Sequence, residues 1–155
     1  MTTHRSLAAI AGIMPDYAQA GVVLCRTGRL TTADDNMVSG DTLQMVPVPE
    51  NAIILDIKAY ANVEIPGATG CHIGDGSSPT RFFDDACLGD VNYLQLEDDG
   101  KPIGCGYCYD EGNDTIDIAL TKAATKVPTS TVFTMHVWYK MMGSISDENW
   151  DGPSA

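Results

Sequence analysis

The stretch that decides the fold runs from Gln44 to Phe83 and reads QMVPVPENAIILDIKAYANVEIPGATGCHIGDGSSPTRFF. Each proline near its start fixes its own φ and moves the preceding residue out of the helical region. A helix therefore cannot run through Val46–Pro49, and we expect extended backbone there. From Ile53 to Val63 apolar and polar side chains alternate, which predicts a half-buried strand of period two.

The alternation also assigns the inward face of this strand. We expect the core to receive Leu55, Ile57, Ala59 and Ala61. Pro66 and Gly67 then break the chain, and an extended run resumes at residues 69–73. The following GDGSSP contains too many turn-forming residues for a regular element, and we expect its glycines to supply positive φ on either side of Asp75.

Further strands flank this segment on both sides. We expect them at residues 21–30, 42–48, 93–96, 102–109, 115–121 and 130–140. Their inward side chains include Ile116, Ile118, Leu120, Phe133, Met135 and Val137. The Asp98–Gly100 turn is typical of a hairpin. About eight or nine short strands at roughly ten-residue spacing predict an all-β fold, a single antiparallel β-sandwich or jelly roll.

The chain divides by composition into three segments. We expect an extended N-terminal arm at residues 1–20, the sandwich domain at residues 21–146 and a polar C-terminal tail at residues 147–155. The arm imitates a signal peptide, but Pro15 and Asp16 interrupt its apolar run, so we expect it to be retained. We expect it to form a short helix or an apolar strap and not a strand.

The charge distribution excludes one class of partner. The formal net charge is −12, and three arginines against one aspartate give residues 1–30 a net charge of +2, so the remainder carries −14. An acidic body repels nucleic-acid phosphates, so we exclude nucleic acid as a main partner. No apolar run approaches the length of a membrane helix, so we expect a soluble protein with no membrane partner.

The cysteines and the acidic turns do not indicate a metal. The five cysteines are Cys25, Cys71, Cys87, Cys105 and Cys108, an odd number that fits assembly in a reducing cytoplasm. The CxxC at residues 105–108 lacks the second ligand pair of a zinc site and the following helix of a redox site. The acidic turns at residues 97–100 and 110–114 match no calcium loop. We expect no metal, no cofactor and no structural disulfide.

The candidate catalytic side chains do not form a motif. Cys71 and Cys105 are candidate nucleophiles, and His72 and His136 are candidate bases, but no flanking sequence indicates that they meet. His136 is more simply a side chain on the open face of the last strand. We assign no catalytic residue and expect no enzyme activity.

Four segments carry a family resemblance, in the order TLQMVPVPENAIILDIKAYANV, ATGCHIGDGSSPTRFF, DTIDIALT and STVFTMHVWY. They resemble small virion structural proteins of tailed bacteriophages, over about two-thirds of the chain from Thr42 onward. The resemblance implies a capsid cement or decoration protein, which is a β-sandwich homo-oligomer. Such a dimer or trimer would sit at capsid symmetry axes on the exterior of the virion, bound to the major capsid protein. No catalytic motif accompanies the resemblance.

The contrast between an acidic body and an apolar, slightly basic arm indicates where such a partner would bind. The candidate contacts in the arm are Arg5, Leu7, Ile10, Ile13 and Met14. Apolar side chains of this kind need a partner unless they cover the chain's own sandwich. The loops around Asp75 and Asp99 are the next candidates.

Two other classes of function stay open at this stage. A tail or head-fibre module that binds a host surface glycan would need exposed aromatic side chains, for which Trp138, Trp150 and the tyrosines are candidates. A small β-sandwich hydrolase would need a base near a nucleophile.

Overall fold

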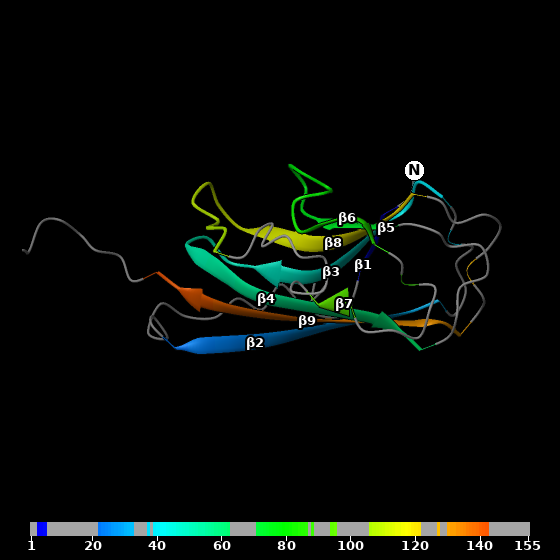
Figure 1. Ribbon diagram of the computed structural model, residues 1–155, viewed down its shortest axis with the longest axis horizontal. Coiled ribbons are helices and arrows are strands. Elements are labelled where there is room, and N and C mark those ends of the chain that lie inside the picture. Colours follow the sequence, from blue (N-terminus) through cyan, green and yellow to red (C-terminus); the bar gives the residue numbers. More distant parts are fainter. Residues whose placement is uncertain are drawn as a thin grey trace, which may run out of the picture.

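All regular structure in the described residues is β-strand. The computed structural model describes residues 3–5, 22–32, 37, 39–62, 71–86, 88, 94–95, 106–121, 127 and 130–142. The strands form two layers that lie face to face (Figure 1). Within these residues there is no helix of a length and hydropathy suited to crossing a membrane.

The two layers are named sheet A and sheet B. Sheet A contains, in spatial order, β1 (Thr3–Arg5), β3 (Thr42–Val48), β8 (Asp114–Leu120), β5 (Cys71–Gly74) and β6 (Phe83–Ala86). Sheet B contains β2 (Val23–Thr31), β9 (Val132–Met141), β4 (Ala52–Ala61) and β7 (Leu94–Gln95). Every pair is antiparallel except β1 with β3, which is parallel. The predicted all-β, mostly antiparallel sandwich is therefore confirmed.

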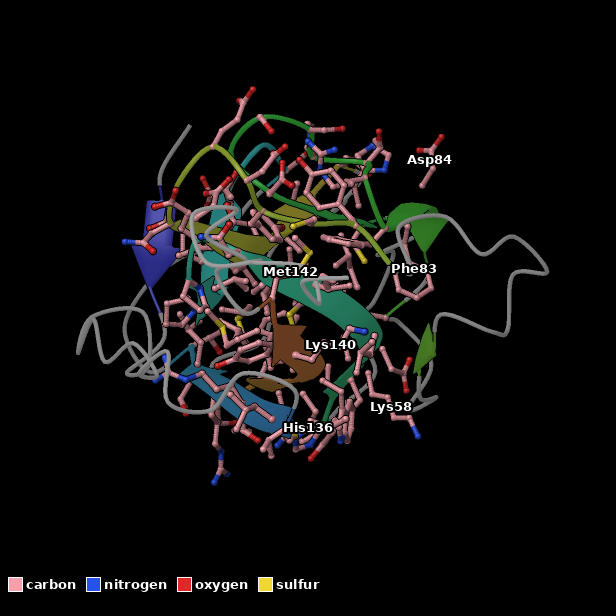
Figure 2. All side chains as sticks on the ribbon, turned by 90° about the vertical axis from the view of Figure 1, so that its left-hand side faces the viewer. Lys58, Phe83, Asp84, His136, Lys140 and Met142 are labelled. Atoms are coloured by element: carbon pink, nitrogen blue, oxygen red, sulfur yellow. The ribbon has the colours of Figure 1, made fainter. Side chains whose placement is uncertain are left out.

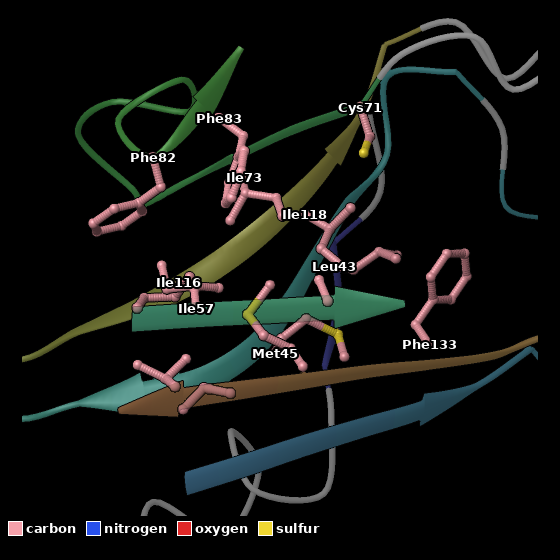
Figure 3. Packing of buried hydrophobic residues seen from close by; sticks show 14 of the residues in the cluster. Leu43, Met45, Ile57, Cys71, Ile73, Phe82, Phe83, Ile116, Ile118 and Phe133 are labelled. Atoms are coloured by element: carbon pink, nitrogen blue, oxygen red, sulfur yellow. The ribbon is translucent and has the colours of Figure 1, made fainter. Parts of the chain in front are cut away.

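The side chains that alternate along β8 and β9 fill the space between the sheets. Ile116, Ile118 and Phe133 are fully buried (Figure 3), and so are Met135 and Val137, as predicted. Leu120 is also buried. Apolar residues on one face of each sheet leave water when the two faces pack together, which contributes most of the stability of a sandwich.

A close approach between the layers occurs at Gly28 of β2. A Cβ atom at this position would lie 2.1 Å from the backbone oxygen of Met45. Because a backbone carbonyl cannot move aside as a flexible side chain can, a larger residue would force β2 away from β3. Glycine is therefore required at this point by the packing of sheet B on sheet A.

The prediction that Leu55 lies in the core is wrong. The pairing of β4 with β9 shifts between Ile54 and Asp56, so Leu55 is the extra residue of a β-bulge. Ile54 is fully buried in its place, whereas Leu55 is only half-buried. The Asp56 carboxylate accepts a hydrogen bond from the Ile57 backbone N–H at 2.9 Å, within the bulge. From Ile57 onward the predicted face is correct.

The expectation that the N-terminal arm contains no strand is also wrong for its first residues. Thr3, His4 and Arg5 pair in parallel with Thr42, Leu43 and Gln44 of β3. An edge strand with unpaired backbone groups readily accepts a short extended segment, because the added hydrogen bonds need no particular side chains. The rest of the predicted arm and the predicted tail lie outside the described residues.

The predicted strand at residues 102–109 is described only at its end. The N–H of Tyr109 donates to the carbonyl of Ala52 at 3.0 Å, and that of Ile54 donates to the carbonyl of Tyr107 at 2.9 Å. Cys108 and Ile53 form an isolated antiparallel bridge. This segment therefore lies along the start of β4. The predicted Asp98–Gly100 hairpin turn lies outside the described residues.

Candidate interaction surfaces

The predicted contact residues fall into three groups. Outside the described residues lie Leu7, Ile10, Ile13, Met14 and Asp99. Arg5 ends β1 at the edge of sheet A. Asp75 lies in the connection between β5 and β6 and has a defined side-chain environment.

The β5–β6 connection is organised around the carboxylate of Asp75, which is 3% exposed. Its Oδ1 accepts hydrogen bonds from the backbone N–H groups of Ser77 at 3.1 Å and Ser78 at 2.7 Å, and from the Ser77 hydroxyl at 2.9 Å. Its Oδ2 accepts hydrogen bonds from Arg81 Nε and from the Tyr109 hydroxyl, the latter at 3.1 Å. The carboxylate thus fixes the shape of the loop.

The Arg81 guanidinium completes this network. It lies 3.9 Å from the ring centroid of Tyr107, whose ring meets that of Tyr109 edge-on at 5.0 Å. Burial raises the pKa of Asp75, but hydrogen bonds from Arg81 and from Ser77 and Ser78 outweigh burial and hold that pKa below its usual value. Asp75 is therefore an internal anchor, and the exposed residues around it are the ones that a partner would touch.

The glycine before Asp75 serves a different purpose from the predicted one. Among the described residues the glycines with positive φ are Gly40, Gly106 and Gly112, so neither Gly74 nor Gly76 belongs to this group. A Cβ atom on Gly74 would lie 2.1 Å from the backbone oxygen of Ser78. Close approach of the loop backbone, and not φ, requires glycine at position 74.

A hollow of about 230 Å³ lies on the outer face of sheet A, beside this loop. Its lining residues are Thr42, Asp75, Gly76, Pro79, Asp117 and Ala119. Asp117 is 6% exposed, and its Oδ1 has no hydrogen-bond partner among the described residues. Burial raises the pKa of Asp117 to about 7, against a lowering by a hydrogen bond from the Thr115 side chain, and the charges of Asp114 and Asp75 raise it further.

The outer face of sheet B carries a cluster of aromatic and basic side chains. His136 Nδ1 and Thr27 Oγ1 share a hydrogen bond at 2.8 Å. The His136 ring lies 6.0 Å from that of Tyr60 and 5.9 Å from that of Trp138. Lys58 Nζ lies 5.4 Å from the centroid of the Trp138 ring. The prediction that His136 lies on the outer face of the last strand agrees with these contacts.

The two outer faces of the sandwich differ in charge. Figure 2 shows Lys58 and His136 on one side of the molecule and Asp84 on the other, while Lys140 belongs to β9 of sheet B. Lys140 and Asp84 are exposed, and Asp84 lies in sheet A, 3.1 Å from His72 Nδ1. Cationic side chains thus accompany sheet B, while carboxylates gather on sheet A.

One end of sheet B exposes apolar side chains. Val22 is 56% exposed, Val23 is 58% exposed and Met142 is 44% exposed. Val23 pairs with Lys140, so these residues lie together where β2 begins and β9 ends. Neighbouring apolar side chains of this size are typical of a contact with another protein.

The candidate catalytic and metal-binding residues do not come together in the described structure. Cys71 is buried on the inner face of β5, while His72 is its outward neighbour. Cys25, Cys71 and Cys108 are thiols, and Cys87 and Cys105 lie outside the described residues. The part of the chain that the structure describes contains no group of three His, Cys, Asp or Glu side chains arranged for a metal ion.

Sequence reasoning missed Arg81, Tyr109 and Asp117. The sequence of Asp75, Gly76 and two serines is typical of a turn in which the Asp side chain accepts hydrogen bonds from backbone N–H groups, and this signal was available. The hydrogen bond from Tyr109 to Asp75 could not be read from the sequence, because it joins residues 34 positions apart. The alternation along β8 implies that Asp117 faces outward, because Ile116 and Ile118 face inward, but the loop that covers Asp117 is distant in sequence.

Comparison with known proteins connects this fold to phage capsids. No family model and no curated protein matches the sequence. A chain in the capsid of Ralstonia phage GP4 aligns with a TM-score of 0.72 and 15% identity, over 90% of this chain and 97% of that one. A chain of the cyanophage Pam1 capsid asymmetric unit aligns with a TM-score of 0.60 and 22% identity, over 83% of this chain and 91% of that one.

A third similar chain belongs to the acid-stable capsid of the Helicobacter pylori bacteriophage KHP30, with a TM-score of 0.54 and 12% identity, over 81% of this chain and 91% of that one. At such identities the similarity establishes the fold alone. The chain shares its fold with components of phage capsids. The resemblance to phage virion structural proteins is thus confirmed at the level of the fold.

Proposed function

We propose that this chain is a virion structural protein of a phage, which binds the major capsid protein lattice from the outside and stabilises it as a cement or decoration protein. The observation that carries the proposal is the alignment with the Ralstonia phage GP4 capsid, which covers 90% of this chain and 97% of that one. The similarity therefore extends over nearly the whole of a capsid component and not over a shared subdomain.

The described surfaces support a role in binding another protein. The apolar end at Val22, Val23 and Met142 and the hydrogen-bonded loop around Asp75 both present surface that a neighbour can cover. Copies assembled in the host cytoplasm would bind as a dimer or trimer at the symmetry axes of the lattice. Repetition of a modest contact at such axes raises the overall affinity through avidity.

The N-terminal arm is part of this proposal. Leu7, Ile10, Ile13 and Met14 would each contribute roughly 1.5–3 kcal/mol if buried against a neighbour, before the cost of ordering the arm. Since β1 pairs with β3, deletion of residues 1–20 would remove a strand of the sandwich as well as the arm. Serine at the four apolar positions is the sharper change, because it keeps β1.

The test is reconstitution on particles that lack the protein. Purified wild-type chain should bind such particles to saturation, appear on the outer surface in a density map of the particle, and raise the temperature at which the capsid opens. The four-serine variant should fold with an unchanged melting temperature and bind less. An absence of wild-type binding, or density inside the capsid, in the portal or in the tail, would refute the proposal.

A second candidate function rests on the cluster of Tyr60, His136 and Trp138 with Lys58. Aromatic rings beside a cation on an open sheet face are suited to stacking on sugar rings of a host glycan. Glycan-array binding by the wild-type chain, lost on Trp138→Ala, would support this function. A small β-sandwich hydrolase needs a hydroxyl or thiol beside a base, and among the described residues the hydrogen bond between Thr27 Oγ1 and His136 Nδ1 comes nearest to such a pair. A hydrolase activity that is lost on His136→Ala would support this function.

A further inference from the structure

The hollow on the outer face of sheet A contains a hydrogen-bond acceptor for which the described residues supply no donor. Asp117 Oδ1 is buried at the hollow, and no donor in the described part of the chain reaches it. Its neighbour on β8, Asp114, accepts the Thr115 N–H at 2.8 Å, and Asp75 accepts its bonds from the loop and from Arg81. Both flanking carboxylates thus have donors, and so does the Asp117 carboxylate through the Thr115 side chain, but Asp117 Oδ1 has none among the described residues.

An unused buried acceptor is costly, because the group has lost its water without gaining a partner. A ligand that supplies the missing donor would remove this cost. The charge around it specifies the ligand, since Asp75, Asp114 and Asp117 place three carboxylates about the hollow, while Arg81 is held by Asp75. A cationic donor is therefore favoured over a neutral or anionic one.

The remaining walls specify the shape of the ligand. Pro79 and Ala119 present hydrocarbon, and Thr42 lies beside Ala119 in the paired strand. A metal ion would need several oxygen or nitrogen ligands, and the described residues offer no such group. A lysine or arginine side chain fits both requirements, because its aliphatic stem can lie on the apolar wall while its charged end reaches the carboxylate.

We propose that the hollow beside the Asp75 loop is a docking site for a lysine or arginine side chain of the capsid lattice, with Asp117 as its acceptor. The proposal rests on the proposed capsid-binding function and adds the face and the chemistry of the contact. A second hollow shares Thr42, Pro79 and Ala119 with the first, so the groove continues along sheet A and has room for residues beside the docked side chain.

The experiment compares three variants in reconstitution on particles lacking the protein, at low and at physiological salt. Asp117→Asn removes the charge but keeps the shape, and Ala119→Leu fills the hollow but keeps the charge. Glu50→Gln is the matched control, since Glu50 is exposed in the β3–β4 turn and the substitution removes the same unit of charge. Circular dichroism and thermal unfolding establish that each variant is folded.

Asp117→Asn and Ala119→Leu should each lower the apparent affinity about tenfold or more, while Glu50→Gln should change it less than about twofold. Wild-type affinity for both test variants would overturn the docking site but leave the proposed function standing. If the wild-type chain itself does not bind, the result refutes both the docking site and the proposed function. A change in the oligomeric state of free Asp117→Asn, with normal particle binding, would identify a second copy as the occupant and overturn the assignment to the capsid.

Discussion

Replacement of Asp117 by asparagine should make the isolated protein more stable at neutral and alkaline pH. Burial raises the pKa of Asp117 to about 7 in the folded protein, whereas an aspartate in an unfolded chain titrates near ~3.9. The folded state therefore holds a proton that the unfolded state has lost over this interval. The protonated Asp117 therefore contributes its full stabilisation below pH ~4, and this stabilisation is lost as the pH rises to about 7.

The size of the effect follows from the difference between the two pKa values. It corresponds to about 4 kcal/mol if the carboxylate stays dry, and we expect roughly 2–4 kcal/mol because the adjoining hollow admits water. Asparagine has the same shape and no charge, so it keeps the stability of the protonated form at every pH. The variant should match the wild type near pH 4 and exceed it by that amount near pH 8.

The assay is urea unfolding followed by tryptophan fluorescence at pH 4.5, 6, 7 and 8, with Glu50→Gln as the control for removal of an exposed charge. The difference in unfolding free energy between Asp117→Asn and the wild type should grow with pH and level off above the pKa of Asp117. A difference that does not depend on pH, or a variant less stable than the wild type at pH 8, would refute the assignment of a buried, unpaired carboxylate.

Three further predictions concern stability, each measured by urea or thermal unfolding. Gly28→Ala should cost at least about 2 kcal/mol, since its Cβ would meet a β3 backbone carbonyl; wild-type stability would show that the layers can separate. Ile54→Ala should cost about 2–5 kcal/mol and Leu55→Ala about 1 kcal/mol or less, and the reverse order would contradict the bulge. Arg81→Met should cost about 3 kcal/mol at pH 7 by leaving buried Asp75 without its cation, and this cost should shrink as the pH falls and Asp75 takes up a proton in the variant.

The strand pattern could be predicted from the sequence because its cause is local. β3 begins and ends where the two prolines and the flanking alternation place it, and the inward residues of β8 and β9 are buried as predicted. A period of two reports directly which side chains share a face, whatever the partner strand. The same local argument cannot say that β3 and β8 lie in one sheet and β4 and β9 in the other.

The errors arise where pairing overrides local pattern. Either Ile54 or Leu55 satisfies the alternation of β4 over part of its length, and the register with β9 decides which one enters the core. The strand at Thr3–Arg5 has no local signal, because it forms by completing the edge of β3. Both outcomes depend on contacts between residues far apart in the sequence.

The candidate site shows the same division. The turn that follows Gly74 is visible in the sequence, but the reason for the glycine is the backbone oxygen of Ser78, which would lie 2.1 Å from a Cβ atom at that position. Only the folded loop brings these two atoms so close. Likewise, Asp117 Oδ1 can be identified as an acceptor without a donor only when all of its neighbours in the folded structure are known. Such a site is defined by the lack of a hydrogen-bond donor near a buried acceptor, and the amino-acid composition does not show which donors lie nearby.

The separation of charge between the sheets makes the two proposed functions compatible. If a cationic side chain of the capsid docks beside Asp117, sheet A faces the particle and sheet B, the opposite layer, faces outward. The cluster of Tyr60, His136 and Trp138 is then presented to the surroundings, where a host glycan would be met. On bound particles a glycan should therefore bind without displacing the protein. Competition between glycan and capsid for the free chain would instead place both contacts on one face, and would exclude this orientation.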